Sequence, residues 1–420
     1  MSSRGFRSKL TWLVALIALM ALFVAACGGD DDDDSGGGAS FSDAGYKAAG
    51  LDKAKIITVD GDIPIGISSA LTGDAAGLGI PIADSAEAAG DGVTVKNHKI
   101  KWIREDDLCT PEGGPAAADR LLKANVVAVV GPICSGGTNA SLAAYDKAGI
   151  THISASATAG NLTNPSRAEG PYVTFFRVPV LNADEAKAQA DFAYDTLKAK
   201  KAFVVFDSDD YGKDLSSEFQ KAFKAKGGTI VGSPQSYEKK TTDFKSVITN
   251  IKAAKPDVIY MSGFYAEATP FLQQLRADSD LKSTPFVGGD GIKNNELITG
   301  AKDAAEGAYL ALPGTLGSQF DTYKSKYAAK FKGNADTATF GPEAYDAATA
   351  IIKALEKVAV DKSGKLEIDL KKLNEEIKKS DFEGASGKVK FGGNGNRAGA
   401  VVRFFKIQGG KYVQLEAGKK

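Results

Sequence analysis

The sequence is poor in the residues that carry most metal-centre and acid–base chemistry. Its 420 residues include only two histidines, His98 and His152, which lie far apart and lack neighbouring ligands at metal-binding spacing. We therefore predict no histidine-based triad, no metal site and no cofactor. An excess of charge is also missing, since 52 basic residues balance 52 acidic ones. This balance leaves no electrostatic footprint for a nucleic-acid partner.

The motifs of several common enzyme classes are missing too. The chain has no Gly-x-x-x-x-Gly-Lys-Ser/Thr phosphate loop, so we do not expect it to hydrolyse ATP. Gly77 and Gly79 resemble the start of a dinucleotide turn, but Ile82 occupies the third glycine position. Ser135 lacks the Gly-x-Ser-x-Gly elbow of α/β hydrolases. We predict no catalytic residue and a protein that is not an enzyme.

The N-terminal region predicts export and anchoring. The apolar stretch at residues 10–24 follows a basic cluster and is too short for a comfortable permanent span, which predicts a signal peptide over residues 1–26. Cys27 follows small residues, as in the bacterial lipobox, where the thiol is acylated; the alternative is a buried cysteine in an anchor helix. Five successive aspartates and several glycines come next, so residues 27–50 are predicted to be a solvated tether. We expect an extracytoplasmic protein anchored to the cell membrane through Cys27.

Two cysteines remain after the lipobox. Cys109 and Cys134 form the even pair that a disulfide requires in an exported chain. Such a bond would restrain the unfolded chain by about 3–4 kcal/mol in the loop-entropy model. A zinc site is the competing interpretation, but two cysteines without further ligands are too few.

The body of the chain alternates short apolar runs with helical patterns. The runs are rich in Val, Ile and Phe, which is typical of strands buried on both faces of a parallel sheet. They cover residues 56–59 (with a continuation toward 67), 100–104, 126–130, 152–155, 173–178, 202–206, 229–232, 258–261, 286–288 and 308–312. Helical spacing between them predicts an α/β fold of two doubly wound, Rossmann-like layers, with ligands at the carboxyl ends of the strands.

Two loops rich in hydroxyl groups follow neighbouring predicted strands. The loop at 131–138 opens a helix whose unpaired N–H groups favour an anion, and Ser135 adds a hydroxyl donor. An alternative role for Ser135 is to cap that helix. The loop at 154–158 follows the next strand, and adjacent parallel strands bring both loops to one edge of the sheet. Together the two loops predict a carboxylate site.

A series of short motifs runs along nearly the whole chain after the tether. They are Leu71-Thr72-Gly73, Asp106-Asp107-Leu108-Cys109, Gly131-Pro132-Ile133-Cys134-Ser135, Ser154 to Thr158 with Asn161-Leu162-Thr163, Asp210-Tyr211-Gly212, Asp243-Phe244, Gly263 to Glu267, and Ala304 to Gly307. In this order they resemble the branched-chain amino-acid-binding proteins of ABC importers, the leucine/isoleucine/valine receptors. The resemblance implies the type I periplasmic binding fold, in which two lobes joined by a three-segment hinge close over a ligand. Lobe 1 would comprise residues 51–181 and 313–392, and lobe 2 residues 182–312 and 393–420.

The resemblance also implies which groups hold the two charges of an amino acid. Ser135 and Thr158, with the backbone at Ser156, match the groups that take the ligand's α-carboxylate. Asp290 matches an acidic residue that holds the α-ammonium from the opposite lobe, although an aspartate beside glycines also fits an ordinary turn.

Further positions match the family's apolar pocket and its disulfide. Leu78, Tyr211, Phe264 and Phe340 match the residues around the ligand's side chain; Tyr345, close to Phe340, is a candidate for which ordinary core is the alternative. Cys109 and Cys134 match the disulfide of lobe 1.

Two departures from the family pattern leave the identity of the ligand open. The position of Asp290 is often glutamate in the leucine receptors, so the acidic side chain here is one methylene shorter. Gly136 and Gly137 replace hydroxyl residues that are common in their loop.

The implied function is that of a monomeric substrate-binding lipoprotein that delivers a small aliphatic amino acid to an ABC permease. The main alternative is a receptor or transporter component of the same fold for an amide, urea, an aromatic acid or another carboxylate. A ligand-sensing receptor and a hydrolase that uses Ser135 are further alternatives; turnover of an ester or amide would revive the last one.

Overall fold

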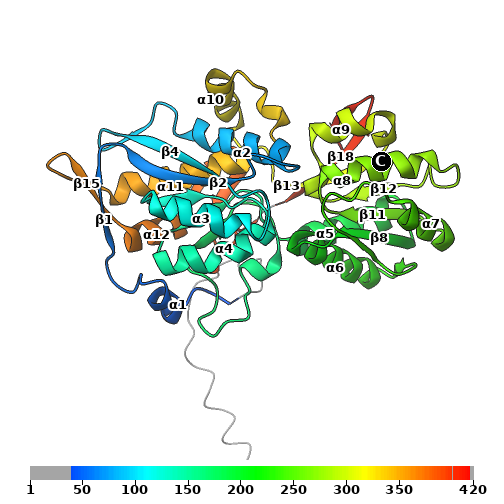
Figure 1. The fold of residues 1–420 in the computed structure, drawn as a ribbon, viewed down its shortest axis with the longest axis horizontal. Coiled ribbons are helices and arrows are strands. Elements are labelled where there is room, and N and C mark those ends of the chain that lie inside the picture. Colours follow the sequence, from blue (N-terminus) through cyan, green and yellow to red (C-terminus); the bar gives the residue numbers. More distant parts are fainter. Residues whose placement is uncertain (1–38, 400, 417–420) are drawn as a thin grey trace, which may run out of the picture. The chain divides into compact units, whose positions relative to one another are not determined.

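The structure is a computed structural model that describes residues 39–399 and 401–416. The predicted signal peptide, the acylation site Cys27 and the aspartate run of the tether lie outside these residues. Two mainly parallel sheets, each flanked by helices, form the main part of the described chain, and we call them and their helices lobe 1 and lobe 2 (Figure 1).

The sheet of lobe 1 has six strands in the order β3-β4-β2-β5-β6-β7. Its strands are β2 (Ile63–Ser69), β3 (Thr94–Val95), β4 (His98–Asp106), β5 (Ala128–Val130), β6 (His152–Ser154) and β7 (Phe175–Arg177). Every neighbouring pair is parallel except β3 with β4. Strands β5, β6 and β7 are buried along their whole length, as their apolar runs predict.

The helices of lobe 1 come from two stretches of the chain. They are α2 (Ala76–Ala89), α3 (Gly113–Lys123), α4 (Ser135–Ala148), α10 (Phe320–Phe331), α11 (Gly341–Val358) and α12 (Leu370–Lys378). Helix α11 packs against α2 and α12, so the later stretch of the chain completes the lobe that the earlier one begins.

The sheet of lobe 2 runs in the order β10-β8-β11-β12-β13-β18-β19, with β9 beside β8. Its strands are β8 (Lys201–Asp207), β9 (Thr229–Ile230), β10 (Gln235–Tyr237), β11 (Val258–Ser262), β12 (Phe286–Gly288), β13 (Tyr309–Pro313), β18 (Val402–Gln408) and β19 (Lys411–Gln414). The pairs from β10 to β13 are parallel, whereas β18 and β19 add an antiparallel edge. Its helices are α5 (Asn182–Asp191), α6 (Asp210–Ala225), α7 (Lys245–Ala254), α8 (Tyr265–Ala277) and α9 (Asn295–Ala301).

The chain passes between the two sheets three times. It leaves lobe 1 after β7, returns after β13, and enters lobe 2 again before β18. The last passage follows the hairpin of β16 (Asp381–Gly384) and β17 (Gly387–Lys390). Three segments of the chain therefore connect the two lobes.

One predicted strand lies elsewhere. We expected the run from residue 56 to continue toward 67 as one strand of the parallel sheet. Instead β1 (Ile56–Asp60) pairs antiparallel with β15 (Lys365–Asp369), in a small sheet completed by β14 (Val360–Lys362). Gly61 has a φ of +89°, a conformation that glycine adopts easily, and this turn separates β1 from β2.

Residues 41–51 also differ from the expectation of a tether that extends to residue 50. Helix α1 (Asp43–Ala48) forms there, capped by Ser42, and Leu51 is fully buried. Phe41 packs edge-on against Phe176 of lobe 1, with ring centroids 5.5 Å apart. The acidic and glycine-rich composition ends before Phe41, so this segment has apolar surface to bury.

Candidate functional site

Ser135 stands where β5 gives way to α4. Cys134 is the N-cap of α4, and no side chain caps this helix, so Ser135 does not have the capping role considered above. The Ser135 hydroxyl instead accepts a hydrogen bond from the backbone N–H of Ala159, at 3.2 Å, in the neighbouring loop after β6. This bond joins the two hydroxyl-rich loops and leaves the hydroxyl proton of Ser135 to donate elsewhere.

The loop after β6 places two further hydroxyl groups. Ser156 donates its hydroxyl to the carbonyl of Ile133, at 2.7 Å, so its side chain holds the loops together. Thr158 is fully buried, and its hydroxyl has no hydrogen-bond partner among the described residues. A buried hydroxyl without a partner is destabilising, and an incoming acceptor atom would satisfy it.

Asp290 supplies the negative charge on the opposite side. It follows β12, is 2% exposed, and accepts hydrogen bonds at Oδ1 from the Tyr211 hydroxyl and, at 2.7 Å, from the Gly291 N–H. Burial raises the pKa of Asp290 to about 6, while the hydrogen bond from Tyr211 acts in the opposite direction. Its Oδ2 has no hydrogen-bond partner among the described residues.

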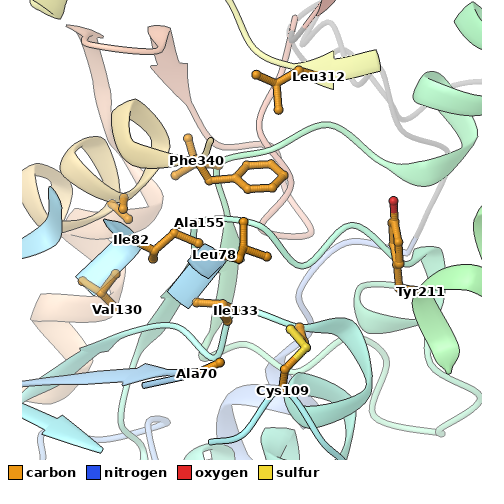
Figure 2. Close-up of a cluster of buried hydrophobic side chains, with 14 of the residues drawn as sticks. Ala70, Leu78, Ile82, Cys109, Val130, Ile133, Ala155, Tyr211, Leu312 and Phe340 are labelled. Atoms are coloured by element: carbon orange, nitrogen blue, oxygen red, sulfur yellow. A yellow bond between two sulfur atoms is a disulfide. The ribbon is translucent and has the colours of Figure 1, made fainter. Parts of the chain in front are cut away.

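These groups from both lobes line one pocket. We call the lining residues from lobe 1 the lobe 1 wall and those from lobe 2 the lobe 2 wall. The lobe 1 wall is Leu78, Ile133, Cys134, Ser135, Ser156 and Phe340, and the lobe 2 wall is Tyr211, Phe264, Asp290 and Gly291. In Figure 2 the side chains of Leu78, Ile133 and Phe340 gather on one side, and the ring of Tyr211 stands apart from them. Hydroxyl groups, a carboxyl group and apolar side chains thus share a single space.

Two predicted site residues do not line this pocket. Thr158 is not among the lining residues, although its neighbour Ala159 donates a hydrogen bond to Ser135. Tyr345 packs in the core of lobe 1, where its ring centroid is 5.4 Å from that of Tyr323. The pocket also contains Ile133 and Gly291, which sequence reasoning missed although each neighbours a predicted position.

Cys109 and Cys134 are joined by a disulfide in this structure, with their Cα atoms 5.1 Å apart. The bond ties the loop after β4 to the N-cap residue of α4, which immediately precedes Ser135. The disulfide therefore holds the lobe 1 wall in place covalently, in addition to the hydrogen bonds between its loops.

The two lobes also contact each other directly around the pocket. The hydroxyl of Tyr265 in lobe 2 accepts a hydrogen bond from the Gly77 N–H in lobe 1, at 3.1 Å. Lys239 of lobe 2 donates to the carbonyl of Cys109 in lobe 1, at 2.6 Å, and forms an ion pair with Asp209 of its own lobe, at 2.8 Å. The bonds of Tyr265 and Lys239 therefore join the two lobes.

Two glycines lie at contacts between the lobes. A Cβ at Gly136 would lie 2.2 Å from Oδ1 of Asp209 in lobe 2, and one at Gly77 would lie 2.3 Å from Oε1 of Glu296. A larger residue at Gly136 would therefore require the Asp209 side chain of the opposite lobe to shift.

Two features are absent from the part of the chain that the structure describes. Within residues 39–399 and 401–416 there is no cluster of three or more His, Cys, Asp or Glu side chains that could hold a metal ion. Searched over the same residues, no helix has both the length and the apolar character needed to cross a membrane.

Comparison with known proteins gives consistent matches. A family model described as periplasmic binding protein matches residues 62–411. An amino acid binding protein of Pseudomonas aeruginosa is 32% identical over 248 residues, which is 57% of this chain; the chain spans only 63% of that relative. A Leu/Ile/Val-binding protein of Rhizobium johnstonii is 28% identical over 84% of this chain and 94% of its own length.

A solved structure with the same fold holds a bound amino acid. The branched-chain amino acid transporter substrate binding protein LivJ of Streptococcus pneumoniae, in complex with isoleucine, superposes with a TM-score of 0.73. It is 25% identical in sequence and covers 84% of this chain and all of its own.

Proposed function

Because the chain belongs to the periplasmic binding protein family and has the type I fold, we propose that it captures a small aliphatic amino acid between its two lobes. The observation that carries this proposal is the pocket in which Ser135 faces the lobe that holds Asp290. An amino-acid zwitterion needs hydrogen-bond donors at one end and a fixed negative charge at the other. The two walls offer these groups from opposite lobes.

The assignment of the ligand's carboxylate rests on the lobe 1 wall. The hydroxyl of Ser135 and the N–H groups at the start of α4 can donate to an anion, and no side chain competes for them at this helix end. Thr158 precedes Ala159, which bonds to Ser135, and its buried hydroxyl, which has no partner, would be satisfied by an acceptor of the ligand. We propose that these groups bind the α-carboxylate.

The assignment of the ammonium and of the side chain rests mainly on the lobe 2 wall. Oδ2 of Asp290 has no donor within the described residues and would accept from the α-ammonium. Leu78 and Phe340 from lobe 1, with Tyr211 and Phe264 from lobe 2, leave apolar surface for an aliphatic side chain.

Binding would couple to closure, since the ligand's two charged ends contact different lobes. A ligand that bonds to both walls has more contacts in the closed form, so it shifts an open form toward the closed one. The closed form would then dock on an ABC permease and release its cargo.

Family membership implies an extracytoplasmic location, and the proposal extends it to a lipid anchor. The sequence before the described residues has the layout of a lipoprotein signal with Cys27 as the acylated residue. Anchoring would keep a monomeric binding protein at the membrane that holds the permease.

A thermal-shift screen of the purified protein tests the proposed ligand class. The panel contains aliphatic amino acids, amides, urea and aromatic acids. A ligand present at 100 times its dissociation constant raises the free energy of unfolding by about 2.7 kcal/mol, which is a readable shift. Stabilisation by aliphatic amino acids alone supports the proposal, whereas stabilisation only by acids without an amine would remove the role of Asp290.

A further inference from the structure

A second carboxyl group, Glu185, lies next to Asp290 outside the pocket lining. Glu185 belongs to α5 and is fully buried. Its Oε1 accepts a hydrogen bond from the Gln189 amide, at 2.8 Å, and another from the backbone N–H of Asp290, at 3.0 Å. The bond from its backbone places Asp290 next to the carboxyl of Glu185.

Each of the two carboxyl groups has one oxygen that accepts hydrogen bonds from other residues and one that does not. Oδ1 of Asp290 accepts from Tyr211 and Gly291, and Oε1 of Glu185 accepts as described above. Oδ2 of Asp290 and Oε2 of Glu185 are both buried and have no hydrogen-bond partner among the described residues. Because ionised carboxylates only accept, the two carboxyl groups could bond to each other only if one of them carried a proton.

The surroundings of the pair disfavour two negative charges. Within the described residues, no lysine or arginine forms an ion pair with Glu185 or Asp290; the titratable groups that face them are Tyr211 of α6 and Tyr260 of β11. Burial raises the pKa of both carboxyls, and the charge of Asp290 raises the pKa of Glu185 further. The proton therefore belongs on Glu185.

The orientation of Gln189 is consistent with a protonated Glu185. The Tyr260 hydroxyl donates to Oε1 of Gln189, at 2.7 Å, which turns the amide NH₂ of Gln189 toward Glu185. Oε1 of Glu185 thus receives two donors, as a carbonyl-type oxygen does, and Oε2, which has no partner, is left to carry a proton.

We propose that Glu185 is a positioning residue of the ammonium site: it is protonated, donates a hydrogen bond to Asp290, and limits the site to one negative charge. This proposal rests on the proposed function, in which Asp290 binds the ligand's ammonium. A single charge matches a single ammonium, and the hydrogen bond from Glu185 keeps Asp290 ionised and fixed in orientation. Because Oδ2 of Asp290 has two lone pairs, it can accept from Glu185 and also from the ammonium. The ionised Asp290 would favour ligands that carry an ammonium over neutral ligands. Because Glu185 carries no charge, no second cation would be needed to neutralise the site.

Infrared difference spectroscopy tests the proton without any ligand. The spectrum of the wild-type protein at pH 7.5 is compared with that of Glu185→Gln in the region of the protonated carboxyl stretch. We expect a protonated-carboxyl band in the wild type that is missing from Glu185→Gln. If the difference contains a carboxylate band instead, Glu185 is ionised and the proposal is overturned.

Calorimetric titration with leucine between pH 5 and 8 tests the positioning role. Glu185→Leu removes the donor, so we expect affinity to fall by about tenfold at pH 7.5. Loss of a hydrogen bond that lowers the pKa of Asp290 raises that pKa, so affinity declines on acidification at a higher pH than in the wild type. Glu185→Gln keeps a neutral donor of similar length and should rescue most of the affinity and the position of this decline.

The outcomes separate the two proposals. Equal losses in both variants, without a shift of the pH profile, would mean a merely structural Glu185 and would overturn the positioning role; a thermal melt of each variant reports its folding. If the wild type binds no amino acid at all, the proposed function fails, and the role that depends on it fails with it. The infrared result then still decides whether Glu185 is protonated.

Discussion

The two walls of the pocket differ in the kind of polarity they present. The lobe 1 wall offers neutral hydroxyl and N–H donors at the start of a helix, held in place by bonds between loops and by a disulfide. The lobe 2 wall offers a carboxyl group, buried among Tyr211, Phe264 and a second carboxyl. Neither wall alone matches a zwitterion, so the account requires both lobes to bind one ligand.

The walls also differ in how their functional atoms are prepared. In lobe 1, the hydroxyl of Thr158 has no partner, and the helix end is uncapped, so donors await an acceptor. In lobe 2, Asp290 already accepts bonds from Tyr211 and Gly291, and one oxygen remains for the ligand. Donors face acceptors across a narrow space, which explains why closure and binding should be linked.

The largest expected effect comes from removing the covalent support of the lobe 1 wall. Replacing both Cys109 and Cys134 by serine should lower the free energy of unfolding by about 3–4 kcal/mol, because the unfolded chain regains loop entropy. Denaturant titration measures the loss. The order of preference among ligands should stay the same, because the disulfide stabilises the wall without choosing the ligand. A changed preference in the double variant would contradict this role.

The next effect in size comes from neutralising the lobe 2 wall. Asp290→Asn should weaken binding of an aliphatic amino acid by about 2–3 kcal/mol, since the ligand's ammonium would lose its charged partner. Calorimetry of the variant measures this change. The matched control is the deaminated acid, whose weak binding should not decrease; an equal loss for both ligands would show that Asp290 supports the fold rather than the ammonium.

Acidification should weaken ligand binding at the lobe 2 wall of the wild-type protein. The ligand's ammonium prefers ionised Asp290, whose pKa burial raises to about 6. The affinity for the amino acid is therefore highest above this pH. Below it, the affinity falls as Asp290 becomes protonated, by up to about tenfold per pH unit. Titrations between pH 5 and 8 check this, and an affinity that is constant across the range would contradict it.

A smaller effect is expected in the lobe 1 wall. Thr158→Val removes a hydroxyl that has no partner in the protein, so binding should weaken by about 1 kcal/mol while the melting temperature of the unliganded protein stays level or rises. Ser135→Ala provides the contrast, because the Ser135 hydroxyl accepts from Ala159 and its loss should lower stability too. Unchanged affinity in Thr158→Val would remove Thr158 from the carboxylate site.

The smallest effect tests closure itself. Gly77→Ala adds a methyl group that would lie 2.3 Å from Glu296 and 2.8 Å from the Tyr265 hydroxyl, so the closed form should be disfavoured and affinity lowered a few-fold. Gly160→Ala is the matched control, because its added Cβ would lie 3.8 Å from Asp214, an ordinary contact. Equal affinities in the two variants would count against a closed form that brings these residues together.

Much of the fold was accessible from the sequence because its strands are buried on both faces. Runs such as 258–261 and 286–288 are apolar without interruption, and β11 and β12 form there. Residues 56–59 misled the prediction because their apolar pattern equals that of the parallel strands, and only a distant partner, β15, decides their sheet. The short strand β10 was missed because its residues 235–237 are mostly polar and lack the apolar pattern of a buried strand.

The site was predicted less completely than the fold. Seven of the nine predicted ligand residues line the pocket, because the family motifs preserve the ends of strands where such residues lie. Tyr345 was included for its closeness to Phe340 along the chain, but the helix turns it into the core. Glu185 could not be recognised, since a glutamate beside Asp184 in a helix looks like an exposed charge until the structure buries it.

The central claim, that one ligand bonds to both walls, is tested most directly by titrating the wild-type protein with leucine and with its two half-molecules. These are 4-methylpentanoate, which lacks the ammonium, and 3-methylbutylamine, which lacks the carboxylate. The account predicts that leucine binds at least about 30-fold more tightly than either compound, since each has lost about 2 kcal/mol of charge-assisted bonding. If 4-methylpentanoate binds as tightly as leucine, Asp290 holds no ammonium and the account is wrong.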